Sequence, residues 1–143
     1  MSYLLDTNVV SALRRRDRAE KRVLDWFRAV AGAEFFISVL TMMEIEVGVK
    51  RLELRDRPQA AVIQRWKEEL LKSQFRGHFL DVDPEVAERC AALHVPDPQP
   101  EIDALIAATA IVKRLTLVTR NERDFANMPV AVINPWATPG QAS

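Results

Sequence analysis

Four acidic residues have the types and positions best suited to chemistry: Asp6, Glu44, Asp103 and Asp124. Asp6 ends a short apolar run, Glu44 and Asp103 lie in the first turns of predicted helices, and Asp124 follows a predicted strand that closes at Thr119. In an open α/β sheet, functional sites form outside the carboxyl ends of the strands. We therefore expect these four carboxylates, from distant parts of the chain, to share one edge of a sheet.

Such a group of carboxylates is unfavourable without a counter-ion, because like charges raise each other's pKa values. A divalent cation removes the conflict, and a set of oxygen-only ligands favours Mg²⁺ or Mn²⁺ over zinc. Ions of this kind orient and activate water and stabilise charge on a phosphate. The pattern therefore predicts metal-dependent hydrolysis of a phosphodiester, with no nucleophilic His, Lys or Cys side chain required.

Each acid also has an ordinary structural interpretation when taken alone. Asp6 could cap a helix, and Asp103 could complement a helix dipole. Glu44 could be a solvated helix charge, and Asp124 a turn residue. The convergence of all four on one sheet edge favours a site. Glu46 is the nearest competitor to Glu44, but a separation of two residues points the two side chains to different faces of a helix.

The elements that must position these residues alternate between strand and helix. The predicted strands are residues 3–5, 35–39, 79–82, 115–119 and 130–133. The predicted helices are 7–13, 19–31, 41–54, one opening at Pro58 and ending near Gly77, 84–93 and 101–114, with 121–128 a polar loop or short helix. This alternation predicts an α/β fold with a mostly parallel central sheet of about four to five strands and helices on both faces.

Composition sets broad limits on the function. The 143 residues predict a single domain spanning 1–143. Twenty Lys and Arg balance twenty Asp and Glu, which excludes a strongly basic, non-specific nucleic-acid binder. The single cysteine, Cys90, forms no zinc pattern. We find no signal peptide and no apolar run of about 20 residues, so we expect a cytoplasmic protein with no membrane association.

Five segments carry a resemblance to a known family. They are residues 5–8 (LDTN), 38–48 (SVLTMMEIEVG), 103–110 (DALIAATA), 117–125 (LVTRNERDF) and the closing 133–136 (INPW). Together they resemble the PIN-domain ribonucleases, specifically the VapC-like toxins of toxin–antitoxin pairs. The segments occur in the family's order and span nearly the whole chain, and the closing Asn-Pro-Trp is similar to the FitB-type branch.

The resemblance implies roles for particular residues. Asp6, Glu44 and Asp103 would be the core metal-binding carboxylates. The family places its fourth acid either where Asn121 stands or where Asp124 stands, so we take Asp124 as the fourth catalytic and metal-binding acid and Asn121 as polar support. The family's polar residues that hold the carboxylates or the water correspond to Asn8 and Thr119.

The resemblance also implies an activity and partners. It implies a Mg²⁺-dependent endoribonuclease, with Mn²⁺ able to substitute, that cuts RNA such as a tRNA or an rRNA loop. A cognate VapB-like antitoxin would occupy the groove with its C-terminal segment. A homodimer and larger toxin–antitoxin complexes are implied, with operator DNA bound only through the antitoxin. The proline-rich stretch 95–100 departs from the family's longer helix, which leaves the site entrance and substrate choice open.

Two other readings of the function remain open. Related folds act on branched DNA, so a structure-specific DNA nuclease is one alternative. A catalytically weak module that binds an antitoxin or RNA is the other, because the position of the fourth acid is ambiguous.

Basic and aromatic residues offer further candidates. Arg14, Arg15 and Arg16 begin an arginine-rich stretch after the first predicted helix, which could follow an RNA backbone near Asp6 or form a solvated surface turn. We interpret the three tryptophans, at positions 26, 66 and 136, as core or interface anchors rather than as platforms for base stacking.

Overall fold

The computed structural model describes residues 1–15 and 20–137, and its centre is a five-stranded parallel sheet. The strands are β1 (Ser2–Leu5), β2 (Glu34–Ser38), β3 (Phe79–Leu80), β4 (Thr116–Val118) and β5 (Val132–Ile133). Their order across the sheet is β3-β2-β1-β4-β5, and every neighbouring pair is parallel. The α/β prediction is confirmed, and β1 occupies the middle of the sheet.

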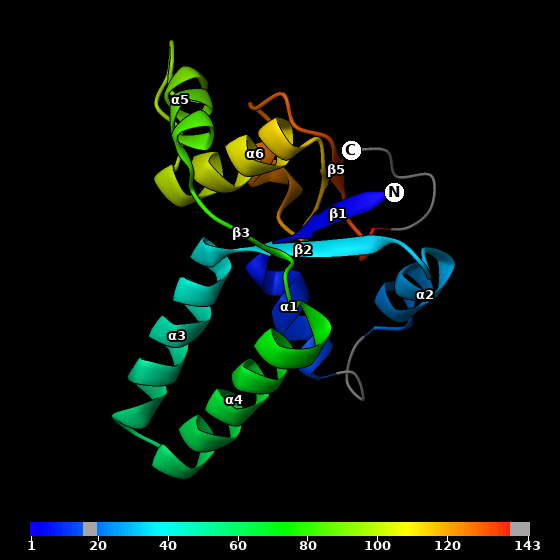
Figure 1. The fold of residues 1–143 in the computed structure, drawn as a ribbon, viewed down its shortest axis with the longest axis vertical. Helices are drawn as coiled ribbons and strands as arrows, with labels where there is room; N and C mark the ends of the chain where they lie inside the picture. The colour runs from blue at the N-terminus through cyan, green and yellow to red at the C-terminus, as the bar shows by residue number, and fades with distance from the viewer. Residues whose placement is uncertain (16–19, 138–143) are drawn as a thin grey trace.

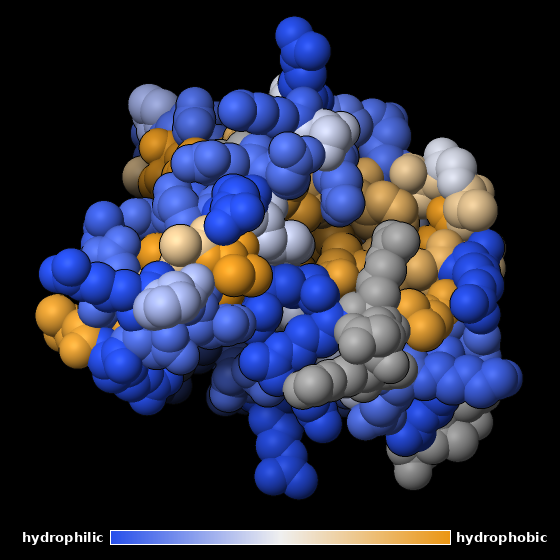
Figure 2. Space-filling model, turned by 90° about the horizontal axis from the view of Figure 1, so that it is seen from below, coloured by the Kyte–Doolittle hydropathy of each residue, from blue (hydrophilic) through white to orange (hydrophobic). Residues whose placement is uncertain are grey.

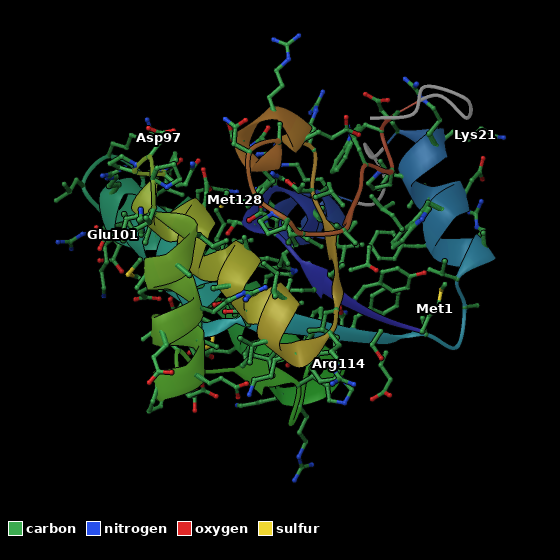
Figure 3. All side chains as sticks on the ribbon, turned by 90° about the horizontal axis from the view of Figure 1, so that it is seen from above. Met1, Lys21, Asp97, Glu101, Arg114 and Met128 are labelled. Atoms are coloured by element: carbon green, nitrogen blue, oxygen red, sulfur yellow. The ribbon has the colours of Figure 1, made fainter. Side chains whose placement is uncertain are left out.

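Helices cover both faces of this sheet, as predicted (Figure 1). They are α1 (Thr7–Arg14), α2 (Lys21–Ala29), α3 (Val39–Glu53), α4 (Arg57–Glu69), the π-helical η2 (Leu70–Gln74), α5 (Pro84–Leu93), α6 (Glu101–Lys113) and the 3-10 helix η3 (Glu122–Phe125). Helices α5 and α6 lie side by side over one face (Figure 3), whereas α1 and α2 pack on the other. Helices α3 and α4 form a hairpin that extends away from the sheet.

The central strand supplies both halves of the core. Leu4 of β1 belongs to the cluster under α5 and α6, while Tyr3 and Leu5 belong to the cluster under α1 and α2. This division follows from the alternation of side chains along a strand. The alanine-rich segment 107–110 of α6 is fully buried, because small side chains let this helix approach the sheet closely.

Several boundaries differ from the prediction for local reasons. The helix expected from Thr41 begins at Val39, since the Ser38 side chain caps it by accepting a hydrogen bond from the Leu40 amide at 3.0 Å. The single helix expected from Pro58 to Gly77 is α4 followed by the π-helical η2. The last strand is shorter than 130–133, because the Val130 amide turns back to the Met128 carbonyl at 2.8 Å.

The outer surface is mixed in character. On α3, the side chains of Met43 and Val47 are exposed, and so is Leu54 at its end. Figure 2, which views the molecule from below, shows hydrophobic residues gathered in patches that hydrophilic residues separate. Within the residues that the structure describes, no helix has both the length and the hydropathy to span a membrane.

Candidate active site

Asp6 lies where the central strand β1 gives way to α1. Its amide donates to the Val118 carbonyl of β4 at 2.9 Å, which ties the strand ends together. Its Oδ1 accepts from the Thr7 amide at 2.9 Å, and its Oδ2 accepts from the Thr119 hydroxyl at 2.9 Å. The residue is only 7% exposed. Asp6 therefore caps α1 and also presents a fixed carboxylate at the sheet edge, so its structural and functional interpretations coexist.

Burial raises the pKa of Asp6 above its ordinary value. The hydrogen bonds from Thr119 and Thr7 oppose this effect, while the negative charges of Glu44 and Asp124 add to it. The net direction is upward, with burial as the largest cause and the two acids, from other parts of the chain, as smaller contributions.

Polar side chains predicted as support surround Asp6. Asn8 Nδ2 lies 3.4 Å from Asp6 Oδ2 and 3.2 Å from the Thr119 hydroxyl oxygen. The Asn121 amide donates to the same hydroxyl at 3.1 Å, so Asn121 contributes its backbone to this network. Thr119 is fully buried, and its hydroxyl donates a hydrogen bond to Asp6. The end of β4 is thereby bound to the end of β1.

Glu44 joins the site from α3 through a threonine of α1. The Thr7 hydroxyl donates to Glu44 Oε1 at 2.7 Å and lies 3.2 Å from the hydroxyl oxygen of Thr41, which is buried. Neither Thr7 nor Thr41 was among the predicted site residues. The spacing of Thr41 and Glu44 could have indicated that Thr41 lies beside Glu44, because residues three apart share a helix face.

Glu46 faces elsewhere, as its spacing predicted. Its carboxylate pairs with Lys67 of α4 and with Lys50 at 3.6 Å. The hydrogen bond from Lys67 lowers the pKa of Glu46. This acid therefore fastens α3 to α4 and is absent from the group around Asp6.

Among the four acids, Asp103 has the most strongly raised pKa. It lies in the first turn of α6, and its pKa is raised to about 6. Burial is the largest cause, followed by the negative charges of Asp124, Asp6 and Glu44. The structure thus brings Asp6, Glu44 and Asp124 within electrostatic reach of Asp103. Asn121 contacts the site through its backbone amide.

The donor set fits a hard divalent cation. The four carboxylates offer only oxygen ligands, and a positive charge among them would relieve the repulsion that raises the pKa values of Asp6 and Asp103. In the described part of the chain, however, no three His, Cys, Asp or Glu side chains form a ready-made metal cage. Two features support a cation here: the ligands are all carboxylate oxygens, and their negative charges repel one another. A complete coordination shell among the described residues is not one of them.

Two hollows flank α1 beside these acids. One, of about 370 Å³ between α1, α3 and α4, includes Thr7, Glu44 and Trp66 in its lining. The other, of about 500 Å³, includes Asn8. Arg14 and Arg15 line both hollows, whereas Arg16 lies outside the described residues.

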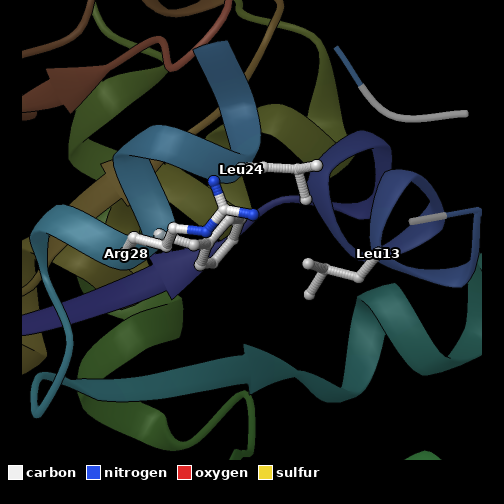
Figure 4. A pocket seen from close by; sticks show the side chains of 4 residues that line it. Leu13, Leu24 and Arg28 are labelled. Atoms are coloured by element: carbon white, nitrogen blue, oxygen red, sulfur yellow. The ribbon is translucent and has the colours of Figure 1, made fainter. Parts of the chain in front are cut away.

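A third hollow between α1 and α2 is lined by Leu13, Leu24, Phe27 and Arg28, and contains none of the acids (Figure 4).

The two histidines and Trp26 make contacts that stabilise the fold away from the acidic group. His78 bonds the Phe35 carbonyl through Nδ1 at 2.9 Å and stacks on Phe36. His94 Nδ1 accepts from the Gln99 amide at 3.0 Å, which fastens the proline-rich loop to the end of α5. Trp26 packs edge-on against Tyr3 with ring centroids 5.1 Å apart, as expected of a core anchor.

Comparison with known proteins adds an independent line of support. Residues 3–131 match the family described as PIN domain. The chain is 33% identical over 138 residues to Toxin FitB of Neisseria gonorrhoeae, covering 93% of this chain and 97% of that protein. It is 46% identical over 66 residues to Ribonuclease VapC14 of Mycobacterium tuberculosis, covering 46% of this chain and 63% of that protein. The crystal structure of FitAcB from Neisseria gonorrhoeae aligns with a TM-score of 0.80 and 31% identity, covering 96% and 100% of the two chains.

Proposed function

The chain belongs to the PIN domain family, and from that premise we propose that it is a metal-dependent endoribonuclease acting as the toxin of a toxin–antitoxin pair. The observation that carries the proposal is the electrostatic coupling of Asp103 with Asp124, Asp6 and Glu44 at one edge of the sheet. The names of two relatives, Toxin FitB and Ribonuclease VapC14, support the same class of activity.

The proposed reaction is hydrolysis of an RNA phosphodiester. A water oxygen bonds to phosphorus, the bond to the 3′-oxygen breaks, and that oxygen leaves with a proton. Asp6, Glu44, Asp103 and Asp124 would hold Mg²⁺, or Mn²⁺ in its place. When bound, such a cation supplies charge stabilisation at the phosphate and orients the attacking water.

The protein's own groups position these carboxylates. Thr119 and Asn8 hold the Oδ2 atom of Asp6, and Thr7 holds the Oε1 atom of Glu44. Fixing the orientation of ligands by such outer contacts commonly contributes 10–100-fold to metal affinity or activity. The threonine and asparagine contacts therefore keep the acids in place before substrate arrives.

The proposed partners follow from the family. We expect a tRNA or an rRNA loop as substrate and a VapB-like antitoxin that blocks the groove beside the acids. A homodimer is expected, with operator DNA reached only through the antitoxin. Arg14, Arg15 and Arg55 line the hollow next to Glu44 and offer positive charge to either an RNA backbone or an acidic antitoxin segment.

A matched pair of variants tests the proposal. Glu44→Gln and Glu46→Gln change the same kind of side chain on one helix, but only Glu44 belongs to the acidic group. With purified protein, total RNA and Mg²⁺, Glu44→Gln should lose cleavage at least 100-fold, while Glu46→Gln should cleave like the unaltered protein. EDTA should stop the reaction. Equal activity of both variants would disprove the site assignment.

The same experiment separates the alternative functions. Branched DNA assayed beside RNA would identify a structure-specific DNA nuclease if only the DNA is cut. A binding module would retain RNA in a filter assay but yield no Mg²⁺-dependent product. Sequencing RNA 5′ ends after brief expression would then identify the target.

A further inference from the structure

The closing Asn-Pro-Trp segment is connected to Asp6 by a chain of hydrogen bonds. The Trp136 amide donates to Asn134 Oδ1 at 2.9 Å, and Asn134 Nδ2 donates to the Arg120 carbonyl at 3.4 Å. The Arg120 amide donates to Asn8 Oδ1 at 3.1 Å, and Asn8 contacts Asp6. The position of Trp136 is therefore coupled to the acidic site through Asn134, Arg120 and Asn8.

Arg120 and Trp136 form a cation–π pair next to the site. The guanidinium carbon of Arg120 lies 5.3 Å from the centroid of the Trp136 indole, within the range of a cation–π contact. Arg120 is exposed, whereas Trp136 is half-buried against the core cluster that contains Tyr3 and Leu5. The indole thus lies behind an exposed, positively charged guanidinium group.

This pair lines the hollow of about 500 Å³ together with Asn8, Arg14 and Arg15. Among the residues that the structure describes, none forms a salt bridge with the side chains of Arg14, Arg15 or Arg120, and Glu20 at the rim pairs with Arg22 at 3.2 Å. Burial and the charge of Arg15 lower the pKa of the Arg14 guanidinium. Within the described residues, the hollow therefore combines arginines that have no salt-bridge partner with an aromatic and guanidinium surface on which a base could stack.

We propose that this hollow is a nucleotide subsite, in which one unpaired base stacks on the Arg120–Trp136 pair while Arg14 and Arg15 hold the adjoining phosphates. The inference rests on the proposed function and adds the class of substrate, because only a single-stranded segment can offer an unstacked base beside the acids. Arginines alone would suit an acidic peptide equally well, but a guanidinium paired with an indole particularly suits a nucleobase, which can stack on either planar group.

Binding without cleavage tests the subsite. The full chain, free of antitoxin and kept in EDTA, is titrated with two fluorescein-labelled strands: a twelve-residue oligoadenylate RNA and an abasic ribose-phosphate strand of equal length. Base stacking is typically worth about 1–3 kcal/mol per base, or about 5–150-fold in affinity. Trp136→Leu should weaken oligoadenylate binding at least fivefold and abasic binding less than twofold.

A second variant keeps the test valid if Trp136→Leu fails to fold. Arg120→Lys retains the charge on an exposed side chain and removes the planar group, so it should weaken oligoadenylate binding about threefold or more and leave the abasic strand unchanged. Arg28→Lys, an exposed arginine paired with Asp25 on α2, is the matched control and should change neither. Arg15→Ala should weaken both strands equally.

The outcomes separate this inference from the proposed function. Equal losses for both strands in Arg120→Lys, or none, would overturn the subsite, as would a loss confined to binding of an acidic antitoxin peptide. If the unaltered chain cuts no RNA with Mg²⁺ yet discriminates between the strands in EDTA, the proposed function fails and the subsite stands. If it cuts RNA and both variants keep their kcat/KM, the subsite alone fails.

Discussion

At the scale of single residues, the site places carboxylates that are partly buried close to other carboxylates that repel them. Asp103 is held among three other carboxylates, so its ionised form is less favourable in the folded chain than in the unfolded chain. The same arrangement that would attract a cation therefore reduces the stability of the metal-free protein. Residues placed for chemistry commonly have such a cost.

Asp103→Asn should reveal both effects. The ordinary carboxyl pKa is 3.8 and the folded value is about 6, so the folded chain binds more protons between these values and loses stability as pH rises from about 4 to 6. The variant lacks this decline, so at pH 7.5 without metal it should be more stable by on the order of 1 kcal/mol, allowing for solvent screening at a half-buried group. Urea unfolding at pH 4.5 and 7.5 measures this effect.

The cleavage assay completes that prediction. Asp103→Asn should lose RNA cleavage at least 100-fold while remaining folded. A variant that cleaves normally, or one whose stability follows the same pH dependence as the unaltered chain, would contradict the role assigned to this carboxylate.

Thr119→Val tests the hydrogen bond that orients Asp6. Loss of this donor removes an influence that lowers the pKa of Asp6, so the acid limb of the pH–rate profile should move to higher pH. Cleavage should fall about 10-fold, as expected for loss of a contact that orients a ligand. Thr119→Ser keeps the hydroxyl and should restore both the rate and the profile, whereas a purely packing role would leave the profile unmoved.

At the scale of elements, the helix ends explain most differences between prediction and structure. The start of α4 was predictable, because Pro58 is favoured in a first turn and Asp56 precedes it as a cap. The π-helical end of the same segment was not, since its sequence continues an ordinary helical pattern into η2. Leu70, the first residue of η2, is buried in the core, so this end of the segment is in contact with residues from distant parts of the chain.

Asp56→Ala should destabilise the α3–α4 hairpin without touching the site. The Asp56 carboxylate accepts from the Gln59 amide at 3.1 Å, and loss of an N-cap typically costs about 1 kcal/mol. Asp56→Asn retains an acceptor and should cost less. Thermal unfolding measures the difference, and RNA cleavage by folded Asp56→Ala should stay normal. A large drop in activity would instead indicate that the hairpin controls the site.

At the scale of the whole molecule, the net charge of zero is a sum of separated parts. Acids gather at the sheet edge, while Arg14 and Arg15 line the hollows on either side of α1. A net charge of zero is therefore compatible with binding a polyanion, because the negative and positive side chains lie in different parts of the surface.

Mg²⁺ should stabilise the whole fold through these acids. A ligand that binds only the folded state adds about 2.7 kcal/mol at 100 times its Kd, so the Tm should rise as Mg²⁺ is titrated. The rise should be larger at pH 7.5 than at pH 5, where protons compete for Asp103, and should disappear in Asp103→Asn. An equal rise in that variant would place the cation elsewhere.

The sequence by itself determined the alternation of strands and helices, the four acids and the family resemblance, because periodicity and motif spacing are local properties of a chain. Only the tertiary structure decided the strand order that places β1 beside β4 and so brings Thr119 to Asp6. It also brought Asp124 within electrostatic reach of Asp6 and Asp103, joined Thr7 to Glu44 and placed the Arg120 guanidinium over the Trp136 indole. These contacts depend on packing and register between distant segments, which no local pattern encodes.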